Sequence, residues 1–547
     1  MTSPPLLAYG VVRLDGSELA PEIAALVVGL RVRDSLRLPD QAFVRLADPL
    51  LKQVDQGLLS VGRALEVLYA SPGAAAPGSV FKGKIQSIEL ELVGDGAFIA
   101  ATAYEPAFAL HQNRRTRVFQ TMTAGDIAES VITSAGLTPA VESSASSSEP
   151  YPFMLQNDET DWQLLWRLAG AIDYEVVGED GTVHFRPAGS ATTGSPLHLH
   201  APEQLISFRP RVSGAQQVDT VVVRGWDPAS AEAIVASKSP PGADSTPGLD
   251  RSDVASAAGG GTWTVGDRTV LSHDEADALA GSLAARMSNA WIEAEGVAVG
   301  DPQLRAGCRV QVSGVGERFG GTYMVTGATH LLIGGQGYQT HFTISGRSAR
   351  TLVDLVDVAS STPIWGTSVV VGVVSQINDP DGLGRVRVQY PALGDDAEGW
   401  WARIASPAAG TSRGLLMMPV VGDEVVLAFE QGDPRRPYVL GSVWNGQATP
   451  GDLVKPDGSF SLASDHDVSV TAAGQAMITA TEALTLKGQN ISAQAESEVE
   501  VKGATITVQA DGSVTVKGAS ITLQSEGNLS VQASGAVQIS GAAVMLG

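Results

Sequence analysis

Apolar residues recur in steps of 15 through the C-terminal part of the chain, separated by turns rich in Gly, Ala, Ser and Asn. Within each unit the apolar positions alternate with polar ones, which is the pattern of short β-strands with one buried face. Repetition at a fixed period predicts stacked copies of one structural module. The recurring apolar residues are Leu484, Leu486, Ile491, Val499, Val501, Ile506, Val514, Val516, Ile521, Leu529, Val531 and Val544.

Such a ribbon of strands has to bury its apolar face against a neighbour. A single-chain solenoid uses about 18 residues per coil, so a repeat of 15 residues is short for one. Three chains wound together would enclose the apolar rows and leave no free strand edge. We therefore predict that residues 448–547 form one third of an intertwined triple-stranded β-helix in a homotrimer, with the recurring apolar residues in its core. A monomeric solenoid is the alternative.

Upstream of the repeat, the pattern predicts a mainly β protein interrupted by three helices. The first is expected to begin after Thr123, a residue type that caps helix N-termini. The second is expected over Asp161–Ala169, and the third after Ser272, which forms a capping-box pattern with Glu275. Residues 236–262 are rich in Pro, Ser and Gly and are predicted to be a mobile loop.

Composition narrows the class of protein. The 547 residues include 61 Gly and only 17% charged residues, which is typical of a chain built from strands and turns. With 36 Lys and Arg against 59 Asp and Glu, the net charge is −23, and a chain this acidic is repelled by nucleic acid. Cys308 is the single cysteine, which excludes internal disulfides and thiolate zinc clusters and fits a reducing compartment.

The sequence shows no pattern typical of a signal peptide or a membrane-spanning segment. The N-terminus lacks a basic segment followed by a long apolar one, so no secretory signal is expected. Apolar runs such as Ser368–Val374 have the length of a strand and fall far short of the ~20 residues that cross a bilayer. We therefore expect neither a signal peptide nor a transmembrane segment.

Two segments have the spacing of catalytic or nucleotide-binding motifs but lack the structural context. Gly410–Gly414 has the G-x-S-x-G pattern of a nucleophile elbow, with Ser412 as the candidate nucleophile. An elbow requires a strand before the serine and a helix after it, whereas strands are expected on both sides here. Gly78–Lys84 imitates a P-loop, but Ile85 stands where Ser or Thr would bind magnesium, and a strand follows. We expect neither site to be functional.

Candidate metal ligands and nucleic-acid contacts are equally weak. Asp379–Gly384 lacks the spaced ligands and closing Glu of a calcium loop, so a tight hairpin turn is expected. His198 and His200 lie on one side of a predicted strand without a third ligand nearby. Trp400 and Trp401 stand beside acidic residues in the sequence, which favours packing over nucleic-acid binding. The sequence therefore predicts no catalytic residue, no cofactor and no metal.

Three segments, taken together and in this order, carry a family resemblance. Val374–Val388, Met418–Val425 and Glu430–Gly446 resemble the oligonucleotide/oligosaccharide-binding (OB) barrel of VgrG-type spike proteins. Upstream, three pieces resemble the end of the hub region in that family: Gly321–Val325, His330 and Tyr338–Phe342. The repeat that follows the barrel is similar to the needle of these proteins, so the resemblance covers nearly the whole chain.

The resemblance implies a division into five parts. The hub consists of two barrel-like β domains with an inserted α/β portion, and the OB-fold barrel and the β-helix needle follow. The expected parts are 1–110 for hub domain 1, 111–200 for the inserted α/β region, 201–360 for hub domain 2, 365–447 for the OB barrel and 448–547 for the needle.

The same resemblance implies a structural function. VgrG-type proteins form the central spike of contractile injection systems, where a trimeric hub joins the hexameric inner tube and the baseplate to a membrane-puncturing needle. It implies a particle like a phage tail, assembled in the bacterial cytoplasm and delivered outside on contraction, with no enzymatic activity. A PAAR-like tip protein and effector cargo are further implied partners. The tip protein would contact Val544, Met545, Leu546 and Gly547.

Alternatives differ in the machine and in the class of protein. Asp34–Asp40 favours an extracellular contractile particle over a type VI secretion or phage tail spike. A tail-associated hydrolase would need an added catalytic module, and Gly446–Phe460 leaves no room for one between barrel and needle. A trimeric sugar-binding adhesin would favour exposed aromatics on the needle, but residues 461–547 contain no Phe, Tyr or Trp.

Overall fold

The structure is a computed structural model that describes residues 9–71, 76–94, 96–144, 148–190, 195–215, 217–333, 337–347, 368–394, 397–454 and 457–545. It divides into two compact units, Met1–Asp452 and Leu453–Gly547. Most of the described helices and strands lie in the first unit, and strands predominate there. The protein is mainly β, as the sequence predicted.

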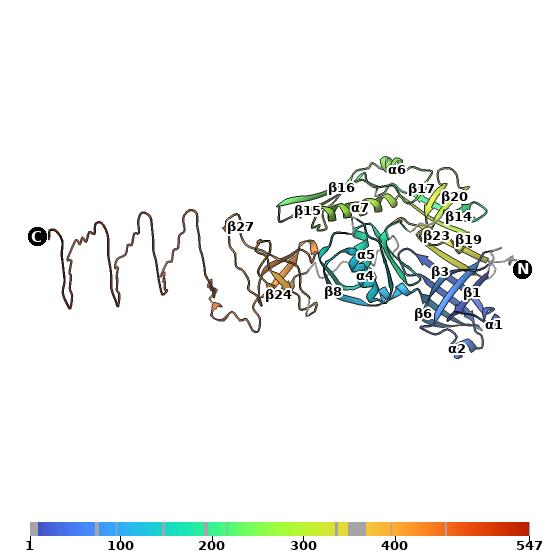
Figure 1. Ribbon diagram of the computed structural model, residues 1–547, viewed down its shortest axis with the longest axis horizontal. Helices are drawn as coiled ribbons and strands as arrows, with labels where there is room; N and C mark the ends of the chain where they lie inside the picture. Colours follow the sequence, from blue (N-terminus) through green and yellow to red (C-terminus); the bar gives the residue numbers. More distant parts are fainter. Residues whose placement is uncertain are drawn as a thin grey trace. The chain divides into compact units, whose positions relative to one another are not determined.

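An 11-stranded sheet forms the largest part of unit 1 and joins segments that are distant in sequence (Figure 1). Its order is β14-β19-β23-β22-β3-β4-β7-β6-β5-β1-β2. The early and late strands meet where β3 pairs antiparallel with β22, so the two predicted hub portions share one continuous sheet. The strands are β1 (Tyr9–Leu14), β2 (Ser17–Glu18), β3 (Val27–Ser35), β4 (Gln41–Ala47), β5 (Ala64–Ala70), β6 (Gly78–Val93), β7 (Gly96–Tyr104), β14 (Leu205–Val212), β19 (Ile292–Val299), β22 (Gly327–Ile333) and β23 (Gly337–Ile344).

Alternation along these strands decides which face of the sheet is buried. In β4, Ala42, Val44 and Leu46 are buried and the residues between them are partly exposed, because successive side chains of a strand point to opposite faces. Tyr69 and Tyr338 stack in the same core, with their ring centroids 4.4 Å apart. Two short helices, α1 (Pro21–Ala24) and α2 (Lys52–Asp55), belong to this part of the chain.

The region inserted between the two halves of the sheet is an α/β layer with its own core. α4 begins at the predicted cap, where the Thr123 hydroxyl accepts the N–H of Asp126 and the Asp126 carboxylate accepts the N–H of Thr123, both at 3.1 Å. α5 begins with the same arrangement between Thr160 and Gln163. The elements are η1 (Pro106–Phe108), α3 (Ala109–Gln112), β8 (Arg114–Met122), α4 (Ala124–Ser134), β9 (Thr138–Val141), β10 (Tyr151–Thr160), α5 (Asp161–Ala171), β11 (Tyr174–Glu179) and β12 (Thr182–Pro187).

A long helix, α7, packs against β15 and β16 (Figure 1). The Ser272 hydroxyl accepts the N–H of Glu275 at 3.0 Å, as the capping-box pattern predicted. The Glu275 carboxylate, however, accepts the N–H of Leu271 rather than that of Ser272, at 2.7 Å. The elements here are β13 (Leu197–His200), β15 (Thr220–Asp227), β16 (Glu232–Lys238), β17 (Thr246–Pro247), α6 (Arg251–Ala257), β18 (Thr262–Val265), α7 (His273–Asn289), β20 (Arg309–Ser313) and β21 (Gly321–Met324).

The structure differs from the loop predicted at residues 236–262. This segment contains β17 and α6, and the Asp250 carboxylate caps α6 by accepting the N–H of Ser252 at 2.7 Å. Thr246 pairs with Thr322 of β21. The composition of the segment is typical of a loop, but a local cap and a strand 76 residues further along the chain give it regular structure.

The second β part of unit 1 is a five-stranded sheet in the order β25-β24-β29-β30-β26. Its core contains Val374, Val388 and Leu427 together with Phe153 and Leu155 of β10, so the inserted region contributes to it. The elements are β24 (Val370–Gln376), β25 (Arg387–Gln389), β26 (Arg403–Ile404), β27 (Ala409–Gly410), β28 (Arg413–Gly414), β29 (Glu424–Phe429), η3 (Glu430–Gly432), β30 (Pro437–Ser442) and η4 (Gly451–Leu453).

Unit 2 contains the 15-residue repeat. Its chain winds in successive turns that recur along the unit (Figure 1). Over the described residues 457–545 no helix or strand is assigned, and every residue from Leu462 to Met545 is exposed. The sequence predicted strands here. A strand is defined by hydrogen bonds to a neighbouring strand, and the winding of this one chain supplies no such neighbour to the described residues.

Candidate assembly surfaces

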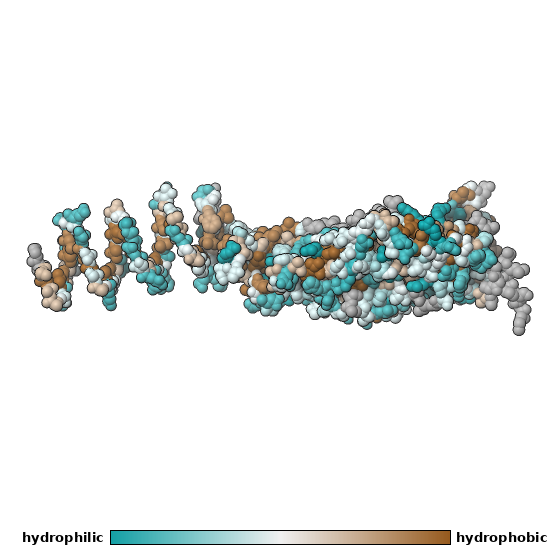
Figure 2. Space-filling view, turned by 90° about the horizontal axis from the view of Figure 1, so that it is seen from above, coloured by the Kyte–Doolittle hydropathy of each residue, from teal (hydrophilic) through white to brown (hydrophobic). Residues whose placement is uncertain are grey.

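The 12 residues predicted as the trimer core are all exposed in the single chain. Their exposed fractions run from 50% at Val544 to 69% at Val516. Figure 2 shows apolar residues recurring on the successive turns of unit 2. The structure therefore arranges these residues in repeated rows but does not pack them within one chain. Large apolar surfaces of this kind are characteristic of contacts with another chain.

The predicted contact for a tip protein lies at the same unit. Val544 is 50% exposed and Met545 is 93% exposed. Leu546 and Gly547, the other two predicted contact residues, lie outside the described residues. Both described side chains are exposed and apolar. Contact with a partner would be favourable for them, because removing apolar surface from water lowers the free energy.

A further apolar surface, in the five-stranded part of unit 1, was missed by sequence reasoning. Leu415, Leu416 and Met417 are 54–66% exposed, and Trp444 is 62% exposed. The run was interpreted as a strand, but β28 ends at Gly414 and the next strand begins ten residues later. An apolar run without the alternation of a half-buried strand was the signal that could have indicated an interface.

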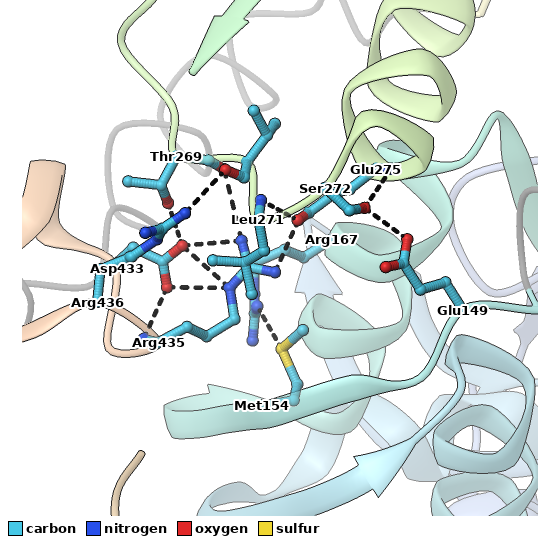
Figure 3. Close-up of polar contacts among 11 residues, drawn as sticks. Glu149, Met154, Arg167, Thr269, Leu271, Ser272, Glu275, Asp433, Arg435 and Arg436 are labelled. Carbon is cyan, nitrogen blue, oxygen red and sulfur yellow. Dashed lines mark hydrogen bonds and ion pairs between the residues drawn. The ribbon is translucent and has the colours of Figure 1, made fainter. Parts of the chain in front are cut away.

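The loop that connects β29 to β30 carries a buried arginine (Figure 3). The side chain of Arg435 is only 11% exposed. It donates to the Asp433 carboxylate at 2.8 Å and to the Glu275 carboxylate of α7 at 2.7 Å. The Thr269 hydroxyl also donates to Asp433. The sequence motif contained Asp433 and Arg435, but their partner Glu275 lies 160 residues away in the chain.

The surroundings of Asp433 and Arg435 favour the charged form of both side chains. Burial raises the pKa of Asp433, but the positive charge and hydrogen bonds of Arg435 outweigh burial and hold that pKa below its usual value. Burial lowers the pKa of Arg435, and the charges of Asp433 and Glu275 more than reverse this effect. The pair therefore stays ionised at neutral pH, and each partner depends on the other for compensation of its buried charge.

A second buried group of charges joins residues that lie in or flank the early and late strands of the large sheet. Arg305 donates to the carboxylates of Asp34 and Asp40, at 2.7 and 3.1 Å, and Glu105 accepts the N–H of Asp40 at 3.1 Å. Burial raises the pKa of Glu105 to about 7, and the charge of Asp34 adds to the rise. Burial and Asp34 also raise the pKa of Asp40. One guanidinium faces three carboxylates, so this group binds protons readily near neutral pH.

The two segments that imitate catalytic motifs form strands and turns. Gly410 and Arg413 pair in the small hairpin of β27 and β28, and the exposed Ser412 lies at its turn with a φ of +55°. No helix follows this serine, so the nucleophile elbow is not formed. Gly78–Lys84 lies inside β6, and a β-carbon at Gly83 would approach the Tyr104 carbonyl oxygen to 2.2 Å. The glycine there allows close pairing of strands.

The candidate metal ligands are likewise accounted for by local structure. The Asp379 carboxylate accepts the N–H groups of Asp381 and Leu383, at 3.1 and 2.9 Å, and forms an ion pair with Arg385. The hydrogen bonds from Arg385 hold the pKa of Asp379 well below its usual value. His200 contacts the Ser313 hydroxyl at 2.9 Å. Within the described ranges, no group of three or more His, Cys, Asp and Glu side chains is arranged to hold a metal.

The two tryptophans of the barrel differ from each other. Trp400 packs against the core of the five-stranded sheet, as predicted. Trp401 was expected beside acidic residues, but the guanidinium carbons of Arg385 and Arg387 lie 5.9 and 6.0 Å from the centroid of its ring. Both arginines are also paired with carboxylates, Arg387 with Glu398 at 3.0 Å. Trp401 therefore lies among compensated charges rather than in a basic groove.

Comparison with known families defines the class. Residues 370–444 match the type VI secretion system/phage-baseplate injector OB domain. This match confirms the resemblance to VgrG-type spike proteins that the barrel motifs predicted. Residues 58–333, half of the chain, match the Alg8 N-terminal domain, so the chain belongs to the Alg8 N-terminal domain family.

Individual relatives match over shorter stretches. The type VI secretion system spike protein VgrG1a of Pseudomonas aeruginosa is 29% identical over 142 residues, which cover 23% of this chain and 22% of that protein. VgrG5 of the same organism is 34% identical over 116 residues, or 20% of this chain and 15% of that protein. The chain thus spans less than a quarter of the length of these curated relatives.

A solved structure extends over more of the chain. The Escherichia coli c3393 protein, described as a component of the type VI secretion system, shares 14% sequence identity with it. That comparison covers 79% of this chain and 99% of the other, with a TM-score of 0.48. Among the described residues of our chain, no helix is both long and apolar enough to cross a membrane.

Proposed function

We propose that this chain is the structural central spike of a contractile injection system and works as a homotrimer without chemistry of its own. The observation that carries the proposal is the exposure of 12 apolar residues at fixed spacing in unit 2, from Leu484 to Val544. An isolated chain with these rows in water would be unstable. Three copies would enclose the rows around one axis and supply each strand with neighbours.

Unit 1 supports the same assembly. The exposed side chains of Leu415, Leu416, Met417 and Trp444 belong to the OB barrel that matches the injector family. A second copy of the barrel would cover these apolar side chains. In a closed three-fold arrangement each chain meets its neighbour head to tail, so the exposed patch of one barrel would lie against a second surface of the next barrel, and this interface repeats three times.

The proposed partners follow from this role. The trimeric hub, with two related β portions per chain, would present six similar surfaces to the hexameric inner tube and the baseplate. Val544 and Met545 would contact a PAAR-like tip protein, and effector cargo would travel on the spike. The needle would cross the target membrane transiently, after assembly of the particle in the bacterial cytoplasm.

We also keep the five-part division and the type of machine as proposals. The division into 1–110, 111–200, 201–360, 365–447 and 448–547 is supported by the boundary between the compact units at Asp452, close to the proposed start of the needle. An extracellular contractile particle is our preferred machine, with a type VI secretion or phage tail spike as the alternative.

The oligomeric state of the full-length chain tests the proposal. We expect light scattering coupled to size-exclusion chromatography to find three chains per particle. Val516→Asp should reduce the trimer strongly, because three carboxylates would be buried together at one level of the needle without partners. Val516 is the most exposed of the predicted core residues in the single chain.

Lys517→Asp provides the matched control, since Lys517 is the next residue along the chain and faces the opposite side of the proposed strand. This variant should remain trimeric. A wild-type chain that is a stable monomer would contradict the proposed assembly, and so would a Val516→Asp variant as trimeric as the Lys517→Asp variant.

A further inference from the structure

The loop Glu430–Arg436 of the OB barrel reaches out of the barrel and contacts the segment that leads into α7. The Gln431 amide donates to the Gly266 carbonyl at 2.7 Å, and Arg436 donates to the carbonyls of Trp226 and Val270, at 3.1 and 3.3 Å. Figure 3 shows Asp433, Arg435 and Arg436 facing Thr269 and Glu275. This short loop thus makes several side-chain hydrogen bonds with residues outside its own domain.

Arg435 is the centre of these contacts. Its guanidinium joins the Asp433 carboxylate, in the same loop, to the Glu275 carboxylate at the first turn of α7. Glu275 in turn accepts the N–H of Leu271, so the arginine is linked through Glu275 to the helix start itself. The Tyr151 ring of β10 lies 5.8 Å from the guanidinium carbon. The loop, α7 and the inserted region therefore meet at one side chain.

Two cavities border this contact. Arg435 lines a cavity of about 230 Å³, together with Phe153, Leu168 and Pro434 among others. Arg435 also lines a second cavity of about 190 Å³, together with Leu271, Ser272 and Leu279 among others. Close packing therefore does not fix the barrel against α7 at this point, and the directional hydrogen bonds of Arg435 have to do so.

The barrel also has an apolar contact with β10, and its residues Phe153 and Leu155 line the first of these cavities. Phe153 and Leu155 of β10 enter the barrel core, and such contacts are non-directional. A buried ion pair contributes little net stability compared with apolar packing, but its geometry is specific because both charges need their partners. The apolar contact thus contributes most of the free energy that keeps the barrel in place. The polar contact sets its orientation.

We propose that the loop Glu430–Arg436 is a latch that fixes the orientation of the OB barrel on the hub through α7, with Arg435 as the residue that closes it. In a spike, which the proposed function assumes, force from the tube reaches the needle through the joint between hub and barrel. The latch makes this joint rigid. Arg435 acts as a positioning residue and contacts no partner protein in this role.

Hydrogen–deuterium exchange on the full-length protein tests the latch. In Arg435→Met, amides in residues 266–276 and 430–436 should exchange at least tenfold faster, because Asp433 and Glu275 lose their shared partner. Strands β24 and β29 inside the barrel should keep their exchange rates. Arg435→Lys should give an intermediate effect, since an ammonium is a point charge and not a planar fork that bridges two carboxylates.

Arg403→Met is the matched control. Arg403 contacts Tyr438 within the barrel, at 3.3 Å, so its removal should leave exchange in 266–276 unchanged. Unchanged exchange in that segment for Arg435→Met would overturn the latch. Equally fast exchange in β24 and β29 would also overturn it, because Arg435 would then be required for the barrel to fold. Should Arg435→Met unfold the whole chain, Arg435→Lys decides by the same two criteria.

The oligomeric state, measured on the same samples, separates the two proposals. Trimers in every variant, with faster exchange only in the latch segments, support both. A monomeric wild-type protein would overturn the proposed spike, while the exchange rates would still decide whether Arg435 orients the barrel.

Discussion

Glu105 is a residue whose charge state is sensitive to conditions near neutral pH. Its carboxylate is buried where the inserted region begins, beside Asp34 and Asp40, and accepts the N–H of Asp40. Burial raises its pKa from 4.5 to about 7 in the folded protein. Between these two values the unfolded chain loses this proton while the folded chain keeps it. Stability is therefore greatest at lower pH and falls as pH rises through about 7.

Glu105→Gln should remove this dependence. The glutamine keeps an oxygen that can accept the Asp40 N–H but carries no charge to bury. At pH 8 we expect the variant to be more stable than the wild type, by about 1–3 kcal/mol. At pH 5, where the folded wild type holds the proton, the two should be nearly equal. Thermal unfolding at both pH values measures the difference.

Glu89→Gln on the exposed face of β6 serves as the control and should change stability little at either pH. A Glu105→Gln variant that is destabilised equally at pH 5 and pH 8 would show that the hydrogen-bond geometry, and not the charge, dominates at this position.

At the scale of elements, β10 belongs to two structures at once. It pairs with β8 in the inserted region, from Tyr151 opposite Met122 to Thr160 opposite Arg114. Met154 lies in the core of the inserted region, whereas Phe153 and Leu155 lie in the core of the barrel. Neighbouring residues of a strand point to opposite faces, so one strand serves both cores.

Phe153→Ala should therefore destabilise the barrel although the substitution lies more than 200 residues before it. Phe153 is fully buried in the barrel core, and truncation of such a side chain typically costs about 3–5 kcal/mol. We expect faster amide exchange in β24 and β29. Leu92→Ala is the comparison, since Leu92 is 68% exposed. Faster exchange confined to β8 and β10 would contradict the shared core.

At the scale of the whole molecule, charge opposes assembly while apolar surface favours it. Each chain carries a net charge of −23, and the proposed association into a trimer would bring three such chains together. The apolar rows of unit 2 have to outweigh this repulsion. Salt screens exposed charges over a distance of about 8 Å at physiological ionic strength. It therefore weakens the repulsion between chains but not the attraction between their apolar surfaces.

Added NaCl should consequently stabilise the assembled protein. Between about 10 mM and 150 mM salt we expect the thermal midpoint to rise and the trimer fraction to increase at low protein concentration. Differential scanning fluorimetry and analytical ultracentrifugation measure these two quantities. A fall in both with salt would mean that attractive ion pairs between chains dominate over the net repulsion.

Local features of this protein were determined by the sequence alone. The caps at Thr123 and Ser272 depend on residues three positions away, and the structure has both. The barrel motifs identified the OB domain, because their residues lie in one contiguous segment that matches the injector family. The 15-residue rows of unit 2 are a property of spacing, and the partner that buries them remains our proposal.

Long-range contacts were decided only by the tertiary structure. The pairing of β3 with β22, the entry of Phe153 into the barrel core and the contact of Arg435 with Glu275 each join residues that are far apart in the chain. Periodicity and motifs depend only on residues that are close in the sequence. These contacts depend on the path of the whole chain. Within the predicted loop at 236–262, the pairing of Thr246 with Thr322 is a contact of the same kind, because its partner strand is distant in the chain.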